Sequence, residues 1–319
     1  MSSHDSNSLQ TYTINLDDPP SERWRQVVRN HKDGITKVLN YCDQILGAFS
    51  TSASWIAWLF SNYVFYIDEL KGISEETGID ISQLVLMQLC YEVCSCCTSI
   101  VYETDEAPLH FRTMDWAMPE LKDITMNVVF TKGGEPLYSA TTWAGYVGIM
   151  TACRLSIGSV SLNYRRTNDG LVSNLKSLIG GSWPAGFLIR HSIETAKNHD
   201  QFVAYLTNST LISPCYFTIS GPRTKSGKII VRDRNNATIE NCTEKYIVQT
   251  NVDNACPESC DNILLSHERL AEVEKILKTA KIDNLHDLDV ALNRYPVINH
   301  ETIYVSLMRC DRGLIYSRT

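Results

Sequence analysis

The stretch from Cys94 to Trp116 constrains the fold of this chain more than any other, because it joins a run of thiols to two strand-like segments. The segments Thr98–Tyr102 and Leu109–Thr113 resemble short β-strands, and the polar turn Glu103–Pro108 separates them. This pattern predicts a β-hairpin whose first strand begins at the thiols.

Formation of that hairpin would bring two charged residues back beside a thiol. The thiol is Cys97, and the charged residues are Arg112 and Asp115 at the end of the second segment. A guanidinium fixed next to a cysteine favours the thiolate, which is the nucleophilic form of the side chain. A buried cysteine-rich strand with a surface salt bridge explains the same spacing, so the hairpin alone does not decide between structure and catalysis.

Further motifs follow one another along nearly the whole chain. They are Y-T-I-N-L-D-D-P-P-S-E-R-W at Tyr12–Trp24, W-A-G-Y-V-G-I-M-T at Trp143–Thr151, S-L-N-Y-R at Ser161–Arg165, Y-F-T-I-S-G at Tyr216–Gly221, Y-I-V-Q-T-N at Tyr246–Asn251 and T-I-Y-V-S-L at Thr302–Leu307. Together with C-T-S-I-V and R-T-M-D of the hairpin, they resemble the acid ceramidase and N-acylethanolamine-hydrolysing acid amidase family, in the cholylglycine-hydrolase branch of N-terminal-nucleophile hydrolases. The resemblance implies an α+β fold, the four-layer αββα N-terminal-nucleophile hydrolase sandwich with a helical N-terminal segment.

The resemblance also implies a mechanism in which the chain is cut just before a cysteine. Cys97 matches the family nucleophile, so autocleavage would break the Cys96–Cys97 bond. The thiol would attack an amide, while the freed α-amine would move the proton. Arg112 would lie beside the thiol, and Asp115 would accept a hydrogen bond from the α-amine.

Two more residues match family positions farther along the chain. Asn251 matches the asparagine whose side-chain amide donates to the oxyanion, and Arg269 matches the arginine found a little beyond it. The chain departs from the family pattern in three places. The spacing from Cys97 to Arg112 is one residue shorter, Cys96 offers a rival nucleophile, and Tyr164 stands where relatives carry a glutamate.

The implied function is an autoproteolytically activated cysteine amidase that hydrolyses a lipid amide, either a ceramide or an N-acylethanolamine, without a cofactor. A rival is an uncleaved, catalytically silent lipid-binding protein of the same fold. The runner-up enzyme is a cysteine–histidine hydrolase, with His110, His191 and His267 near motif stretches. We expect no metal site, because the cysteines near the hairpin lack a second C-x-x-C pair downstream.

Helical and strand-like patterns divide the chain near the nucleophile. Residues 1–96 are mainly helical, whereas residues 97–319 mix strands with helices. The family resemblance implies that the first piece corresponds to an α-subunit and the second to a β-subunit. The partner of each piece would therefore be the other piece, in an α/β heterodimer. Strand-like runs are expected near residues 126–131, 137–142, 159–163, 216–220, 228–232, 246–249, 302–308 and 314–317.

Capping residues predict where several helices begin. Ser21 is expected to cap a helix that carries Trp24, and a second amphipathic helix is expected from about Ile35 to Leu46. Ser266 and Asn284 are expected to cap two helices near the C-terminus.

The most apolar piece of the chain is the aromatic segment Trp55–Ile67. It is too short to cross a bilayer, which needs about twenty apolar residues. A buried core helix explains it, and so does an interfacial helix that makes transient contact with a membrane. This segment and Trp143–Ile149 are candidate walls for an apolar acyl-chain channel.

Charge and targeting signals limit the partners and the compartment. The formal net charge of -7 argues against nucleic acid, which requires a basic face. Met1–Ser8 shows no apolar signal region, which is compatible with a cytoplasmic protein, whereas the family resemblance implies a lysosome. Glycosylation sequons at Asn208, Asn236 and Asn241 have meaning only in a secretory compartment.

Overall fold

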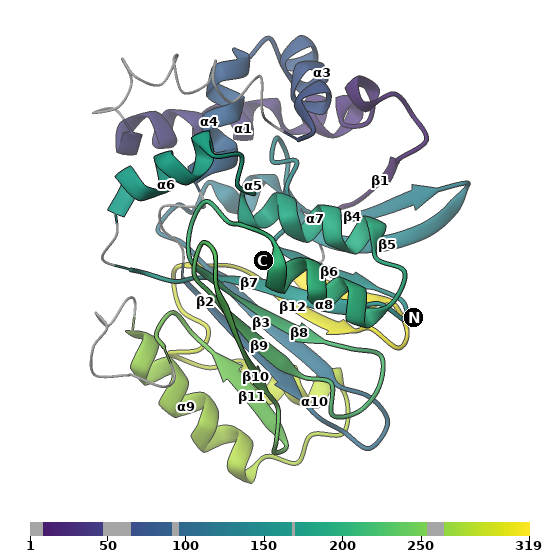
Figure 1. Cartoon of the computed structure of the whole chain (residues 1–319), viewed down its shortest axis with the longest axis vertical. Coiled ribbons are helices and arrows are strands. Elements are labelled where there is room, and N and C mark those ends of the chain that lie inside the picture. Colours follow the sequence, from purple (N-terminus) through teal and green to yellow (C-terminus); the bar gives the residue numbers. More distant parts are fainter. Residues whose placement is uncertain (1–8, 47–64, 91–95, 168–169, 254–264) are drawn as a thin grey trace, which may run out of the picture.

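A computed structural model describes residues 9–46, 65–90, 96–167, 170–253 and 265–319 of the protein. Two β-sheets pack face to face and helices cover the outer face of each sheet (Figure 1). The layers therefore follow the αββα order that the family resemblance implies. In the described ranges, no helix is long and apolar enough to cross a membrane.

The larger sheet combines a strand from the N-terminal segment with strands from the rest of the chain. Its order is β1 (Thr11–Asn15), β4 (Thr125–Lys132), β5 (Glu135–Trp143), β6 (Thr151–Arg154), β7 (Gly158–Tyr164), β8 (Cys215–Ser220), β9 (Lys228–Arg232) and β10 (Ala237–Asn241). β1 runs parallel to β4, and the other neighbours are antiparallel. The N-terminal segment is thus hydrogen-bonded into the same sheet as the C-terminal part.

The smaller sheet contains the predicted hairpin at its centre. Its order is β11 (Tyr246–Gln249), β2 (Cys96–Tyr102), β3 (Leu109–Asp115), β12 (Thr302–Arg309) and β13 (Leu314–Arg318). β2 and β3 pair without a register shift from the Cys96–Asp115 pair to the Tyr102–Leu109 pair. The hairpin is confirmed, and its shortened turn leaves both strands in register.

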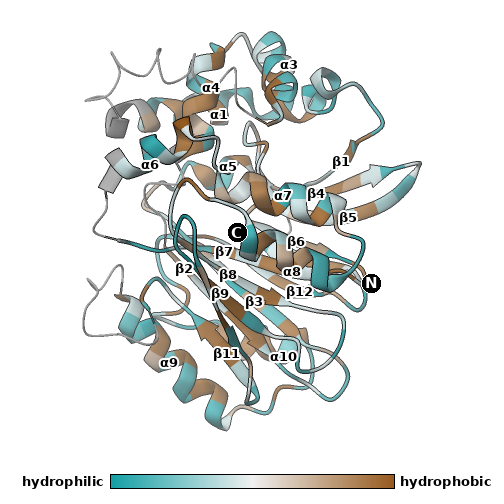
Figure 2. Ribbon diagram, in the orientation of Figure 1, coloured by the Kyte–Doolittle hydropathy of each residue, from teal (hydrophilic) through white to brown (hydrophobic). Residues whose placement is uncertain are grey.

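Helices form the two outer layers. They are η1 (Pro20–Glu22), α1 (Arg25–Leu46), α3 (Ile67–Thr77), α4 (Ile81–Cys90), α5 (Leu121–Ile124), α6 (Gly170–Ile179), α7 (Ala185–Thr195), α8 (His199–Asn208), α9 (Ser266–Thr279) and α10 (Leu285–Leu292). α1, α3 and α4 gather at one end of the molecule, and α9 and α10 lie beside the smaller sheet (Figure 1). Hydrophobic and hydrophilic residues alternate along α9 (Figure 2), as expected for a helix with one face on a sheet.

Side chains alternate along β2 between an apolar and a polar environment. Ile100 and Tyr102 pack in an apolar cluster with residues of α9 and α10. Ser99 points the other way and donates to Asn163 Oδ1 of the larger sheet at 2.6 Å. In the same layer His110 bonds to Ser159 at 2.8 Å. The space between the two sheets therefore contains a buried layer of polar side chains.

The N-terminal helix differs from the prediction. A single helix, α1, replaces the two expected helices, and Ser21 lies in η1 with no side-chain cap because Pro19 occupies the N-cap position. Gly34 lies in the middle of α1, where a Cβ would come within 2.5 Å of the Ile124 side chain. The glycine allows α5 to approach α1 closely, and it does not break the helix.

The two predicted caps near the C-terminus had different outcomes. Asn284 caps α10 as expected, since its side chain accepts a hydrogen bond from the Asp287 backbone N–H at 3.0 Å. The Ser266 prediction is wrong, because Leu265 occupies the N-cap position of α9 and has no side-chain cap. The Ser266 hydroxyl instead accepts a hydrogen bond from Arg269 at 3.0 Å.

Most of the aromatic segment Trp55–Ile67 lies outside the described residues, so its interfacial role stays a prediction. The described part begins at Phe65, which is 43% exposed and stacks on Trp183 with ring centroids 3.6 Å apart. In the described ranges, no group of three or more His, Cys, Asp or Glu side chains is arranged to hold a metal ion.

Candidate active site

Cys97 lies in β2 between the two sheets, with its side chain fully buried. The Arg112 Nη2 atom donates to Cys97 Sγ at 3.3 Å, and Arg112 is also fully buried. The Arg112 guanidinium is held in turn by the Leu162 carbonyl at 3.1 Å and by the Tyr304 hydroxyl. The thiol therefore faces a fixed positive charge, which favours its thiolate form.

Tyr304 of β12 supports this arginine; it belongs to the motif T-I-Y-V-S-L but was not among the predicted site residues. The Arg112 guanidinium lies 5.0 Å from the centroid of the Tyr304 ring, and the Tyr304 hydroxyl is 2.9 Å from Thr151 Oγ1. Burial raises the pKa of Tyr304, with Arg112 opposing it, so that the phenol stays neutral. An arginine held by a neutral phenol keeps its full charge for the thiol.

Asn251 holds the backbone nitrogen of Cys97. The Cys97 N–H donates to Asn251 Oδ1 at 2.8 Å, and Asn251 Nδ2 donates to the Tyr164 carbonyl at 2.9 Å. The nitrogen that cleavage would free as an α-amine therefore already has a partner. In the continuous chain Asn251 Nδ2 is directed at Tyr164, so its expected role at an oxyanion stays a prediction.

Arg269 connects three of the other predicted residues, which are Cys97, Asn251 and Asp115. Its Nη1 donates to the Cys97 carbonyl at 2.6 Å and to Thr98 Oγ1 at 2.8 Å. Its Nη2 donates to Asn251 Oδ1 at 3.0 Å, and its Nη1 lies 3.6 Å from Asp115 Oδ2. Arg269 is fully buried, so these contacts are shielded from water.

Asp115 lies at the end of β3 and is fully buried. Its Oδ1 accepts from Thr302 at 2.7 Å and its Oδ2 accepts from Thr113 at 3.2 Å. Burial raises the pKa of Asp115, while the charge of Arg269 and the two hydroxyls oppose the rise. The expected hydrogen bond from an α-amine concerns the cut chain and stays a prediction.

The rival thiol has a different environment. Cys96 pairs with Asp115 across the hairpin, whereas Cys97 pairs with Met114, so the two cysteines face opposite sides of the sheet. Burial raises the pKa of Cys96, with Arg269 opposing it, and this disfavours its thiolate. The surroundings therefore favour Cys97 as the nucleophile.

Strand β7 fixes three parts of the site through consecutive residues. The contacts are Arg112 Nη2 to the Leu162 carbonyl, Asn163 Nδ2 to the carbonyls of Gln249 (2.9 Å) and Thr250 (3.1 Å), and Asn251 Nδ2 to the Tyr164 carbonyl. Asn163 was not among the predicted residues. Its signal in the sequence was the motif S-L-N-Y-R, where it is the one amide in a strand.

Two of the three histidines of the cysteine–histidine alternative are engaged elsewhere. Both ring nitrogens of His110 bond to hydroxyls, those of Ser159 and Ser161, at 2.8 Å each. Burial lowers the pKa of His110 to about 3, so its ring is neutral. His191 stacks on Trp183 with centroids 4.9 Å apart. Neither ring lies beside the Cys97 thiol.

An apolar pocket lies next to the end of β3 and is shared between the N-terminal helices and the sandwich. Its lining residues are Val38, Cys42, Met87, Trp116, Met118, Leu121, Trp143 and Tyr146. The predicted wall Trp143–Ile149 thus contributes two aromatic side chains. The pocket holds about 10 Å³ in this conformation, which is room for about one water molecule.

Comparisons with known proteins agree with this architecture. A family model described as the beta subunit of N-acylethanolamine-hydrolyzing acid amidase matches residues 7–66. The chain is 30% identical over 306 residues to an uncharacterized protein of Acanthamoeba polyphaga mimivirus, covering 92% of this chain and 94% of that protein. It is 28% identical over 336 residues to acid ceramidase of Balaenoptera acutorostrata scammoni, covering 95% of this chain and 84% of that protein. The solved structure of a Caenorhabditis elegans N-acylethanolamine-hydrolyzing acid amidase ortholog matches with a TM-score of 0.60 and 28% identity, covering 67% of this chain and 93% of that one.

Proposed function

This chain belongs to the acid ceramidase and N-acylethanolamine-hydrolysing acid amidase family, and from that premise we propose that it is an autoproteolytically activated cysteine amidase of lipid amides. Members of the family with these names are hydrolases of carbon–nitrogen amide bonds. Cys97 is the nucleophile of this enzyme, and the Cys96–Cys97 bond is the cleavage site. The products of turnover are a fatty acid and an amine.

One observation carries the proposal: three different buried side chains hold three different atoms of Cys97. Arg112 donates to the sulfur, Asn251 accepts from the nitrogen and Arg269 donates to the carbonyl oxygen. The backbone N–H and C=O of any buried residue need partners, but a purely structural cysteine needs no cation at its sulfur. Burying two arginines is costly unless their charges are used or paired. The arrangement stabilises the Cys97 thiolate and holds the backbone nitrogen of the same residue in a fixed position.

Autocleavage follows from the position of the thiolate beside its own peptide bond. Cys97 Sγ attacks the carbonyl carbon of Cys96, the carbon–nitrogen bond breaks, and the Cys97 nitrogen takes up the proton. This acyl shift frees the α-amine of Cys97 and leaves the Cys96 carbonyl joined to the Cys97 sulfur as a thioester. Water then hydrolyses the thioester, which releases a carboxylate at Cys96 and restores the Cys97 thiol. The hydrogen bond from the Cys97 N–H to Asn251 keeps that nitrogen in place during the change.

Turnover of a lipid amide uses the same groups after cleavage. The thiolate attacks the amide carbonyl, and the protonated α-amine, with an ordinary pKa of about 7.7–8.0, gives its proton to the leaving amine. The neutral α-amine then takes a proton from water, which hydrolyses the acyl thioester, releases the fatty acid and restores the thiol. Asp115 orients the α-amine and Asn251 Nδ2 donates to the developing oxyanion. Arg112 stabilises the thiolate in each cycle.

The apolar pocket indicates where an acyl chain is bound. Aromatic and aliphatic side chains line it, and it lies directly after Asp115 through Trp116. Val38, Cys42 and Met87 come from residues 1–96, so both pieces of the cleaved chain build the pocket. The pocket must widen to admit a chain.

Denaturing gel electrophoresis, with and without reductant, tests the cleavage on protein held at acidic and at neutral pH. We expect two pieces that divide at residue 97, and hydrolysis of a ceramide or an N-acylethanolamine by the cut protein. One intact chain under every condition, with lipid bound and no product formed, would support the silent lipid-binding alternative. A panel of N-acyl amides then separates the two head groups.

A further inference from the structure

Glu69 of α3 and Arg190 of α7 form a fully buried ion pair across the two halves of the chain. Arg190 Nη1 and Nη2 donate to the two Glu69 carboxylate oxygens at 2.6 and 2.7 Å. Glu69 is 1% exposed and Arg190 is not exposed. Glu69 belongs to residues 1–96 and Arg190 to residues 97–319, so the pair joins segments that lie on opposite sides of the proposed cut.

Further donors complete the coordination of the Glu69 carboxylate. Arg23 Nη1 donates to Glu69 Oε1 at 2.8 Å, and Trp24 Nε1 donates to Glu69 Oε2 at 2.5 Å. We call Glu69, Arg23, Trp24 and Arg190 the Glu69 cluster. A buried carboxylate with four donor contacts from two arginines and an indole is well compensated for its loss of water.

The same arginine reaches the loop that follows β5. Arg190 Nη1 donates to the Val147 carbonyl at 2.8 Å, while the Val147 N–H donates to Gln88 Oε1 of α4 at 2.9 Å. Gln88 Nε2 also donates to the Gly145 carbonyl at 2.9 Å. Two buried polar links therefore fasten α3 and α4 to one region of the sandwich.

The groups around the cluster keep its charges in place at acidic pH. The titratable or charged side chains that face it are Arg23, Arg190, Glu194, Tyr66 and Tyr138. Burial alone would raise the pKa of Glu69, but the charge of Arg190 and the hydrogen bonds from Arg190, Trp24 and Arg23 outweigh burial and lower it below the ordinary 4.5. A lowered carboxyl pKa means that the stabilisation is present above the unfolded-state value and is lost only as the pH falls through the folded-state value.

We infer that the Glu69 cluster is the anchor that keeps the N-terminal piece bound to the rest of the protein after cleavage, in acid as well as at neutral pH. This inference rests on the proposed cleavage. Before the cut, the covalent bond holds the halves together. After it, only noncovalent contacts hold the two pieces together, and removal of the Glu69 carboxylate would leave Arg190 in the interior of the complex without this counter-charge, which is costly.

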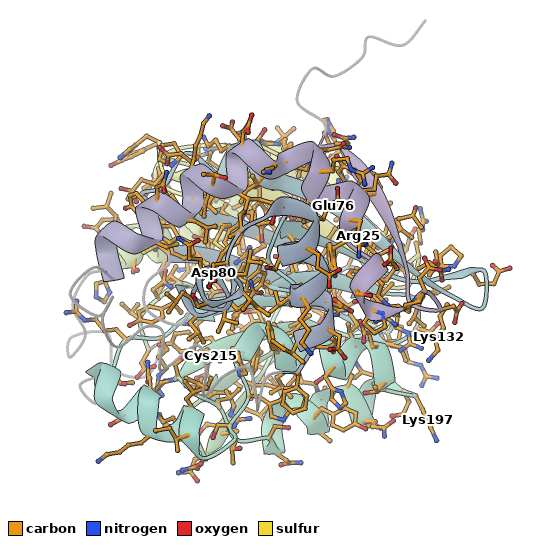
Figure 3. All side chains as sticks on the ribbon, turned by 90° about the horizontal axis from the view of Figure 1, so that it is seen from above. Arg25, Glu76, Asp80, Lys132, Lys197 and Cys215 are labelled. Carbon is orange, nitrogen blue, oxygen red and sulfur yellow. The ribbon has the colours of Figure 1, made fainter. Side chains whose placement is uncertain are left out.

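Size-exclusion chromatography of the cut protein at pH 7.5 and pH 4.5 tests the anchor. In the wild type we expect both pieces to co-elute at both pH values. In Glu69→Gln we expect the N-terminal piece to be lost from the complex, because the neutral amide can accept hydrogen bonds but leaves the buried Arg190 without this counter-charge. Glu76→Gln is the matched control, since Glu76 lies on the same helix but pairs with Arg25 and Arg29 of its own piece at 3.5 and 2.7 Å. Glu76 and Arg25 lie close together near the surface in Figure 3.

The covalent chain provides the control for folding. The Glu69→Gln change in a Cys97→Ala chain, which is not cut, should give a folded, monodisperse protein. The loss of the N-terminal piece in the cut Glu69→Gln protein would then come from separation of the two pieces and not from misfolding. If that chain does not fold, Arg190→Lys retains a cation opposite Glu69 and should release the N-terminal piece at a lower urea concentration than the wild type. Cut Glu69→Gln or Arg190→Lys protein whose pieces separate no more easily than the wild type would overturn the anchor. A wild-type chain that is never cut contradicts the cleavage instead, and with it the need for an anchor.

Discussion

Replacement of Arg269 by methionine tests whether this residue holds the site by its charge. Arg269 donates to the Cys97 carbonyl and to Asn251, and it is the buried partner of Asp115 at 3.6 Å. Breaking a buried ion pair by removing one member costs about 3–5 kcal/mol, because the other charge is left in the interior. At roughly 2 °C per kcal/mol for a protein of this size, the melting temperature should fall by roughly 6–10 °C.

The assay is urea unfolding in a Cys97→Ala background, so that cleavage does not change the unfolding species. A double-mutant cycle with Asp115→Asn isolates the pair. If the unpaired carboxylate causes the loss, Asp115→Asn should restore about 2–3 kcal/mol to the Arg269→Met chain. Effects that add within about 0.5 kcal/mol would refute the reasoning, since residues that interact are not additive.

The pH dependence of the loss has a definite sign. Burial raises the folded-state pKa of Asp115 above its ordinary 3.8, so its contribution to stability is complete below that value and is lost as the pH rises through the raised value. Without Arg269 the pKa rises further. The deficit of Arg269→Met should therefore be largest at neutral pH and should shrink toward pH 4. A deficit that grows on acidification would contradict this assignment.

Three variants, one of them with a matched control, report on other parts of the site. Asp115→Asn should lower kcat by roughly 100-fold or more with little change in KM, because the α-amine loses its orienting group; a normal kcat with a raised KM would make Asp115 a binding residue. Ser99→Ala removes the buried hydroxyl that donates to the side-chain amide of Asn163, which positions the segment before Asn251, and it should slow cleavage. Ser220→Ala removes a hydroxyl of the same buried polar layer, far from Cys97, and should destabilise the protein by a similar amount, about 1 kcal/mol, without slowing cleavage. Tyr304→Phe should slow alkylation of the Cys97 thiol by iodoacetamide, because Arg112 loses a hydroxyl that holds it; an unchanged rate would show that the phenol is not needed.

The sequence predicts the β2–β3 hairpin well, because the residues that determine the hairpin are close together in the chain. Two short strand-like segments and a polar turn determine the β2–β3 register, and that register alone places Arg112 on the same side as Cys97. Most strands of the sandwich also fall within a residue or two of their predicted ranges. Local alternation and turn residues are sufficient for elements of this kind.

The rest of the site depends on contacts between distant segments. Asn251 and Arg269 reach Cys97 only after β11 pairs with β2 and α9 packs beside it, and the family resemblance, not any local pattern, singled them out. The polar layer between the sheets could not be predicted either, because no local sequence pattern separates hydroxyl side chains that will be buried from those that will be exposed. The caps at Ser21 and Ser266 failed because neighbouring Pro19 and Leu265 took the capping position.

β1, β6 and β10 show the same limit for whole elements. The parallel pairing of β1 with β4 joins the N-terminal segment to the larger sheet and could not be inferred from the residues of β1. β6 is only four residues long, and β10 carries polar residues at a sheet edge. Short or edge strands have weak periodicity, so the sequence did not predict them.

Intact mass measurement of the purified protein, after incubation at acidic pH, tests the central claim most directly. We expect two masses in the wild type, one for a piece that ends at Cys96 and one for a piece that begins with Cys97. We expect a single full-length mass in Cys97→Ala and normal cleavage in Cys96→Ala. A wild-type chain of one full-length mass that still hydrolyses a lipid amide would contradict the account, as would cleavage that persists in Cys97→Ala.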